Sequence, residues 1–406
     1  MTISNGHSSL RKRLLPLLVA PALALCALSD AVAQARPDIR IAIIQARSGP
    51  LEEYGNQAST GFRLGLDHAT GGTLQVAGRK IVLIERDDQG KPDIGKSTLA
   101  TAYSDDKADI AVASTSSSVT LAMLPVAEEA KKILLVEPAA ADSITGAQWN
   151  RYIFRTSRSS SQEAIANAVA LDKPGVSIAT LSQNNAFGRD GVQAFKQALK
   201  SAKLVQEEYL PPTTTDFSAS AQRLIDALKN LPGRKIIWVL WAGSANPFKI
   251  ADLDLGRYGI EIAAIGNSLA VMAPYKGLPG LEGATYYYYG IPKNPVNDWL
   301  VAEHQKRFKT PPDFVTAGGM SAAIALVTAL TKTNGDATAD KLIAAMEGMS
   351  FESPKGMMTF RKEDHQALQS MYHFRIKSDP AVAWGIPELV REIKASEMNV
   401  PVLNRR

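Results

Sequence analysis

The segment that decides the fold is "DIRIAIIQARSGPLEEYGNQASTGFRLGLDHAT", residues 38–70. Its first part, residues 39–44, is a short apolar run typical of a buried strand. The residues SGP at 48–50 predict a turn, and the apolar residues of 55–69 recur at helical spacing. The segment therefore predicts a strand followed by a turn and a helix.

The same alternation of strand and helix continues along the chain. Further strand-like runs with helix-like segments between them lie at residues 80–88, 108–114, 133–139, 176–183, 204–212, 235–243 and 260–268. Such alternation implies parallel strands with helical crossovers on both faces. We expect two α/β lobes of similar build. After them, residues 296–333 predict two helices, and residues 356–360 and 370–377 predict a hairpin.

The N-terminus has the pattern of a cleaved signal peptide. A basic RKR at 11–13 precedes an apolar run at 14–28 and small residues before two A-x-A sites, with cleavage expected after Ala33 or Ala35. The apolar run is short and interrupted by proline, which disfavours an uncleaved anchor helix. The one cysteine, Cys26, lies inside this segment, so we expect no disulfide and no cysteine-bound metal in the mature chain.

Charge and motifs exclude several classes of function. The net charge of +5 is spread along the chain, and no basic run outside the signal indicates nucleic acid. No later apolar run suggests a membrane span. The histidines of the mature chain are His68, His304, His365 and His373. None has metal-ligand spacing, and no G-x-S-x-G motif is present, so we expect no enzyme, no metal and no cofactor.

One motif suggests nucleotide binding instead. Residues 90–98, GKPDIGKST, match the phosphate-binding pattern G-x-x-x-x-G-K-[ST]. Aspartates lie just before the segment, at positions 87 and 88, and within it, at position 93, although a phosphate loop should not be acidic. Pro92 suits a first helical turn, which places Gly95 and Lys96 inside the helix. We therefore interpret the match as a strand-to-helix turn.

These elements, in this order, resemble the type I periplasmic substrate-binding proteins of ABC transporters, the leucine/isoleucine/valine-binding-like branch. The resemblance covers residues 39–377. Its carriers are SGPLEEYG (48–55), DD…P (Asp87, Asp88 and Pro92), STSSS (114–118), EPAAADSIT (137–145), FRTSRSSSQ (154–162) and NNAFGRDG (184–191). It implies two Rossmann-like lobes that are joined by three crossings and close over a ligand. Carried onto this chain, the domains are a signal peptide (1–35), lobe 1 (38–157 plus 287–352), lobe 2 (158–286 plus 353–380) and a C-terminal tail (381–406).

The resemblance also places a carboxylate site at STSSS and PAAAD. The matching positions are Ser116, Ser117, Ala139 and Ala141. Helix N-terminal N–H groups and serine hydroxyls can hold a carboxylate without a cationic side chain. The serines could instead simply cap the helix. Amino-acid binders have a threonine where this chain has Ala141.

The positions that hold the ligand ammonium in the amino-acid binders fall on Ser160 and Ser268. Because a buried ammonium without a carboxylate is costly, we expect a ligand that is not an α-amino acid. Arg158 and Arg47 are candidates to pair with a ligand carboxylate, or they are surface arginines.

Pocket candidates with large apolar side chains are Tyr54, Phe187, Trp241 and Met320. Trp241 ends a strand, where a core position is the commoner outcome. Four tyrosines in the run TYYYYG (285–290) fall where the chain crosses between the lobes. Alternate tyrosines of a strand share a face, so one pair of them could stack on a ligand ring.

The resemblance thus implies a periplasmic solute-binding component of an ABC importer, with an inner-membrane permease as its partner. We expect a small carboxylate ligand, an aromatic acid, bound in the cleft between the lobes. One alternative is a branched-chain amino acid or amide for the same kind of transporter. The other is a periplasmic sensor that delivers its ligand to a receptor.

Overall fold

The computed structural model describes residues 1–2, 4–6 and 36–404. The expected signal peptide, including Cys26 and both cleavage sites, lies almost entirely outside the described residues. The three sheets of the described chain belong to one compact unit, Arg36–Arg406.

The first lobe is built on a six-stranded sheet with the order β2-β3-β1-β4-β5-β6. Its strands are β1 (Ile39–Gln45), β2 (Gln75–Val76), β3 (Arg79–Asp87), β4 (Ile110–Ala113), β5 (Ile133–Val136) and β6 (Ile153–Arg155). All neighbours pair in parallel except β2 with β3. The crossover helices are α1 (Glu52–Ala69), α2 (Pro92–Ser104) and α3 (Ser117–Ala130). The prediction of parallel strands with helical crossovers is confirmed.

The phosphate-loop match lies at the start of α2. The helix begins at Pro92, so Gly95 and Lys96 are inside it. The backbone of a phosphate loop must wrap around its ligand, which these helical residues cannot do. The interpretation of this segment as a strand-to-helix turn is therefore confirmed.

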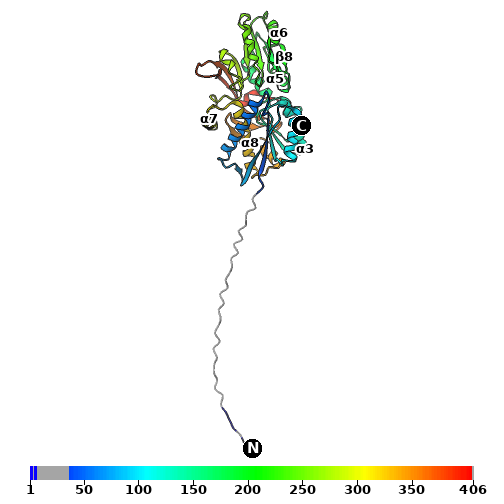
Figure 1. Cartoon of the computed structure of the whole chain (residues 1–406), viewed down its shortest axis with the longest axis vertical. Coiled ribbons are helices and arrows are strands. Elements are labelled where there is room, and N and C mark those ends of the chain that lie inside the picture. The colour runs from blue at the N-terminus through cyan, green and yellow to red at the C-terminus, as the bar shows by residue number, and fades with distance from the viewer. Residues whose placement is uncertain (3, 7–35, 405–406) are drawn as a thin grey trace. The chain divides into compact units, whose positions relative to one another are not determined.

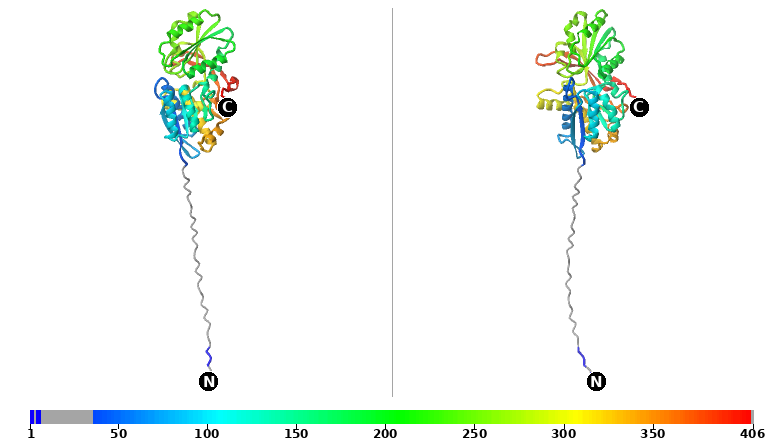
Figure 2. Two further views of the ribbon diagram at one scale, coloured as in Figure 1. Left: turned by 90° about the vertical axis from the view of Figure 1, so that its right-hand side faces the viewer. Right: turned by 45° about the vertical axis from the view of Figure 1, so that its right-hand side comes forward.

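The second lobe is built on a seven-stranded sheet with the order β16-β15-β11-β10-β9-β7-β8. Its strands are β7 (Val176–Gln183), β8 (Lys203–Leu210), β9 (Arg234–Leu240), β10 (Ile260–Ala264), β11 (Glu282–Thr285), β15 (Met371–Lys377) and β16 (Ile386–Ile393). Helices α4 (Ser160–Leu171), α5 (Ala186–Ala198) and α6 (Ser218–Leu228) pack on it. Figures 1 and 2 show α5, α6 and β8 of this lobe in green, next to the lobe that carries α3 and α8.

The expected hairpin of residues 356–360 with 370–377 is wrong. Strand β13 (Gly356–Phe360) pairs instead with β12 (Ser350–Ser353) and β14 (Ala367–Leu368), and β15 pairs with β11 and β16. Phe351, Met358 and Phe360 are buried in the core of the first lobe. We therefore propose that the third crossing lies near residues 369–370, not at 352–353.

The expected surface tail also contains regular structure. Strand β16 pairs with β15 along its whole length, and a short helix, α10 (Ala395–Met398), follows it. Leu389 and Val390 of β16 remain 45 % and 48 % exposed. The strand is held mainly by backbone pairing at a sheet edge, so it lacks the apolar alternation that would predict it.

The longest helix, α8 (Phe314–Lys332), is the centre of the first lobe, with α7 (Pro295–Phe308) before it and α9 (Ala339–Met346) after it. It is long and apolar enough to span a membrane, which was not expected from the sequence. However, 89 % of its apolar window is buried inside the protein, as in the core helix of a soluble domain. Its partner is α1, and glycines allow the close approach: a Cβ on Gly61 would lie 1.9 Å from the carbonyl oxygen of Thr316.

Candidate functional site

A cleft lies between the two lobes, where strand ends of both sheets meet. Its lining comes from the end of β7, from the segments after β1, β4, β5, β6, β7, β8 and β9, and from the first turn of α8. The lining residues are Pro50, Leu51, Tyr54, Thr115, Ser116, Ser117, Ser118, Pro138, Ala139, Ala140, Arg158, Gln183, Asn185, Phe187, Pro212, Ala242, Phe314 and Val315. Ligands of open α/β sheets bind outside the carboxyl ends of the strands. The cavity measures about 90 Å³, the scale of one small molecule.

Six of the residues expected at the site line this cleft. They are Tyr54, Ser116, Ser117, Ala139, Arg158 and Phe187. They come from α1, the N-terminus of α3, the loop after β5, the segment before α4, and α5. The topology thus collects side chains that are up to 133 positions apart in the sequence, since 187 − 54 = 133.

The N-terminus of α3 forms the polar end of the cleft. Ser116 is the N-cap residue, and its Oγ accepts a hydrogen bond from the N–H of Val119 at 3.5 Å. Ser117 Oγ accepts from the N–H groups of Ala140 and Ala141 at 3.3 and 3.2 Å. The N–H of Ala141 therefore has a partner inside the protein and is not a free donor, and Ala141 does not line the cleft. Ser116 therefore caps the helix, Ser117 holds the loop after β5, and both serines also line the cleft.

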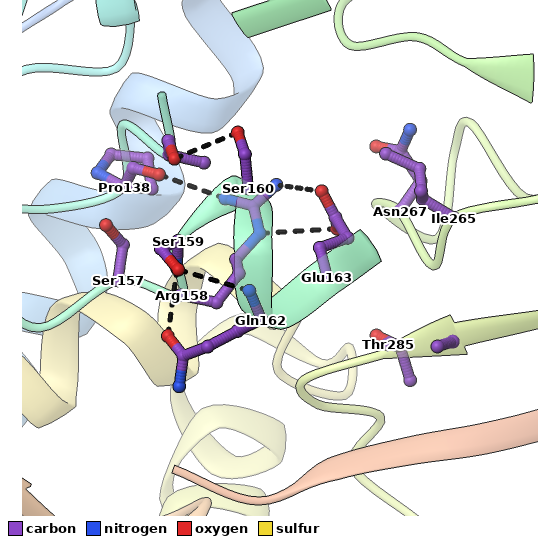
Figure 3. A network of polar contacts seen from close by, with 12 residues as sticks. Pro138, Ser157, Arg158, Ser159, Ser160, Gln162, Glu163, Ile265, Asn267 and Thr285 are labelled. Carbon is purple, nitrogen blue, oxygen red and sulfur yellow. Dashed lines mark hydrogen bonds and ion pairs between the residues drawn. The ribbon is translucent and has the colours of Figure 1, made fainter. Parts of the chain in front are cut away.

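Arg158 lines the cleft but belongs to a buried ion pair. Its Nε and Nη2 donate to the two carboxylate oxygens of Glu163 at 3.3 and 3.5 Å, and Nη1 donates to the carbonyl of Pro138 at 3.1 Å (Figure 3). Burial opposes the charge, but Glu163 beside it raises the pKa of Arg158. Arg158 also lies over the rings of Phe187 and Tyr286, at 5.9 and 5.1 Å. The guanidinium is thus fixed in place and already neutralised.

The two serines expected at the ammonium positions lie outside the lining. Ser160 Oγ donates to the carbonyl of Ala140 at 3.1 Å. Ser268 Oγ accepts from the N–H of Val271 at 3.3 Å. Both are fully or almost fully buried, and each has its polar group bonded to backbone. They organise the segments around the cleft.

Three other residues that were expected at the ligand site pack or pair elsewhere in the protein. Arg47 forms a surface ion pair with Glu85, Trp241 packs on Phe217 in the core of the second lobe, and Met320 lies beneath α1. Trp241 is 1 % exposed and Met320 is completely buried. None of them lines the cleft. Side-chain direction at a strand end or on a buried helix depends on tertiary packing, which sequence spacing does not reveal.

Several lining residues were not predicted, and Gln183, Asn185 and Phe314 stand out among them. Gln183 Nε2 donates to the carbonyl of Ala242 at 2.8 Å, and Asn185 Oδ1 caps α5 by accepting from the N–H of Gly188 at 3.0 Å. Gln183 is the last residue of β7 and Asn185 follows it closely, so the strand-end rule could have found them. Phe314 comes from the first turn of α8, which no local pattern connects to the cleft.

A buried charged cluster lies behind Arg158. Lys355 is 2 % exposed and its Nζ lies 4.9 Å from the centre of the Tyr286 ring. Burial lowers the pKa of Lys355 to about 8, and burial raises the pKa of Glu137. Within the described residues, Glu137 Oε1, Tyr286 Oη and Lys355 Nζ find no hydrogen-bond partner.

Comparison with known proteins agrees with this arrangement. The family model "Periplasmic binding protein" matches residues 38–381. A crystal structure of an ABC-type branched-chain amino acid transporter from Rhodopseudomonas palustris CGA009 is 63 % identical, with a TM-score of 0.81 over 91 % of this chain and 100 % of that one. A solute-binding protein of an ABC transporter from Rhodopseudomonas palustris BisB5, in complex with 3,4-dihydroxybenzoic acid, is 25 % identical, with a TM-score of 0.76 over 88 % of this chain and 98 % of that one.

A curated relative points to the same branch. The Leu/Ile/Val-binding protein homolog 6 of Brucella abortus (strain 2308) is 26 % identical over 263 residues. The match spans 62 % of this chain and 66 % of that relative. Together with the two-lobed fold and the cleft at the strand ends, these matches show that the chain belongs to the periplasmic binding protein family, as a substrate-binding protein of the ABC-transporter type.

Proposed function

We propose that this protein is the periplasmic solute-binding component of an ABC importer and that it captures a small aromatic carboxylate. The observation that carries the ligand class is the lining of the cleft. Among its described residues, no aspartate or glutamate lines it, and the one cation is Arg158. An α-amino acid would bury its ammonium without a carboxylate partner, which is costly.

The two ends of the cleft suit the two ends of such a ligand. At the polar end, the first N–H groups of α3 lack partners within the helix and carry partial positive charge. Ser116, Ser117 and Ser118 add hydroxyl groups there. Around the rest of the cleft, Tyr54, Phe187 and Phe314 offer aromatic surface for a ring.

The comparisons support the proposal in different ways. The relative at 25 % identity holds 3,4-dihydroxybenzoic acid, an aromatic carboxylate. The relative at 63 % identity is called a branched-chain amino acid transporter. That name makes a branched-chain amino acid the second candidate, with the same cleft and the same permease partner. The absence of an acidic lining residue in the described chain favours the first candidate.

A ligand screen decides between the two. Purified protein without its signal segment is titrated with benzoate, 3,4-dihydroxybenzoate, leucine, isoleucine and valine, and thermal shift and calorimetry record binding. We expect the aromatic acids to stabilise the protein and the amino acids to have no effect. Strong stabilisation by leucine with none by either aromatic acid would refute the ligand class and leave the transporter role in place.

A further inference from the structure

Two residues of the first lobe contact one loop of the second lobe. Tyr54 on α1 donates through its hydroxyl to Asn267 Oδ1 at 2.5 Å and accepts from the N–H of Gly243 at 3.1 Å. Asp313, the N-cap of α8, accepts at Oδ2 from the N–H of Leu269 at 2.9 Å. The loop that contains Asn267 and Leu269 follows β10, so these contacts cross from one sheet's lobe to the other's.

Both sides of these contacts are fixed by further hydrogen bonds. Asn267 Nδ2 donates to the carbonyl of Trp241 at 2.8 Å, which sets the position of its side-chain oxygen. Asp313 Oδ1 accepts from the N–H of Phe314 at 2.7 Å, and Gln57 Nε2 donates to Oδ2 at 3.1 Å. Tyr54, Asn267 and Asp313 are 4 %, 3 % and 8 % exposed. The contacts are therefore rigid and shielded from water, which strengthens each hydrogen bond.

The same elements also form a wall of the cleft. The ring of Tyr54 lines the cavity and packs edge-on against Phe314 at 5.9 Å. Phe314 lines the cavity too and directly follows Asp313. A ligand that contacts these two rings therefore touches the residues whose polar atoms hold the opposite lobe.

We propose that Tyr54 and Asp313 form a two-point latch on the loop 267–269, and that they are positioning residues which hold the lobes closed over the ligand. The proposal rests on the proposed function only in taking the cleft as the ligand site. Losing a latch bond removes an interaction made in the closed form alone. The ligand should then dissociate faster, while its contacts with the aromatic rings, and hence its selectivity, stay the same.

Tyr54→Phe is the sharpest test because it keeps the ring and removes the hydroxyl. With 3,4-dihydroxybenzoate as the probe, we expect the dissociation rate constant in stopped-flow fluorescence to rise at least about 5-fold, since the variant loses both hydrogen bonds of the hydroxyl. The order of preference among aromatic acids should not change. Tyr103→Phe is the matched control, since its buried hydroxyl donates to the carbonyl of Ile133 within the first lobe. It should leave dissociation unchanged.

Amide hydrogen exchange tests the latch without any ligand. Tyr54→Phe should speed exchange at the N–H of Gly243, and Asp313→Ala should speed exchange at the N–H of Leu269, while Tyr103→Phe should do neither. If 3,4-dihydroxybenzoate fails to bind the wild type, the ligand class fails and the exchange experiment still decides the latch. The proposal would be overturned if the Gly243 N–H of Tyr54→Phe and the Leu269 N–H of Asp313→Ala both exchanged at the same rate as in the wild type.

Discussion

Ser116 has two roles at the cleft, and they can be measured separately. Its Oγ caps α3 through the N–H of Val119, and its hydroxyl lies at the polar end of the cavity. An N-cap contributes about 1 kcal/mol to stability, whereas a hydrogen bond to a charged group contributes about 1.5–3 kcal/mol. For Arg158, a substitution could not separate an effect on ligand binding from an effect on stability, because removing the arginine would leave Glu163 buried without its ion-pair partner.

We therefore predict that Ser116→Ala weakens binding of an aromatic carboxylate by about 10–100-fold, the equivalent of about 1.5–3 kcal/mol. Calorimetric titration provides the measurement. Asn294→Ala is the control, because Asn294 caps α7 in the same way at the N–H of Asn297 but does not line the cleft. Both variants should lose similar stability, and only Ser116→Ala should lose affinity. Equal affinity in the two variants would remove Ser116 from the ligand site.

At the scale of elements, the contact between α1 and α8 sets one wall of the cleft. The helices approach so closely that a Cβ on Gly61 would lie 1.9 Å from the carbonyl oxygen of Thr316. On the same side, Gly319 lies against the backbone of Ala58. Tyr54 on α1 and Phe314 on α8 are the cavity residues that depend on this packing. The glycines are needed for the approach of two backbones, not for a special dihedral angle.

Gly61→Ala should therefore lower the free energy of unfolding by at least about 1–3 kcal/mol, the usual cost of overpacking, since backbone and not a movable side chain blocks the methyl group. Urea denaturation measures the change. Gly277→Ala is the matched control, because a Cβ there meets no atom within 4 Å and the residue has no positive φ. An unfolding midpoint of Gly61→Ala equal to that of Gly277→Ala would contradict this account of the helix contact.

At the scale of the whole molecule, the sequence predicts the architecture better than it predicts the site. Alternating strands and helices leave few arrangements, so the parallel strands of both large sheets follow from local patterns. Strand β15 was expected to pair with its near neighbour, but its partner β11 lies about 90 residues earlier, and only tertiary packing determines such pairing. In the cleft, the serines of α3 are predictable because a helix start is a local feature. Phe314 is not, because only the crossing of α1 and α8 brings it there.

Closure of the whole molecule should also depend on pH through Asp313. Burial raises the pKa of Asp313 from 3.8 to about 7 in this structure, and the hydrogen bonds from the N–H groups of Leu269 and Phe314 oppose that rise only in part. The groups facing it are Glu53, Gln57 and the two N–H groups; Glu53 further raises the pKa, and Gln57 lowers it. When the lobes separate, water reaches the carboxylate and its pKa should return toward the ordinary value.

The sign of the effect follows from this difference. Because the pKa of Asp313 is higher in the closed form, closure is accompanied by proton uptake at Asp313. The stabilisation of the closed form by this proton is complete below pH 3.8 and is lost as the pH rises through about 7. Affinity for an aromatic carboxylate should thus fall from pH 5 to pH 7.5, by at most about tenfold per pH unit, and then level off. Calorimetry at each pH, in two buffers of different ionisation enthalpy, measures both the affinity and the proton uptake. Asp313→Asn should remove the slope and the uptake. If the wild-type affinity did not change between pH 5 and 8, closure would take up no proton. If the slope persisted in Asp313→Asn, a group other than Asp313 would take up the proton.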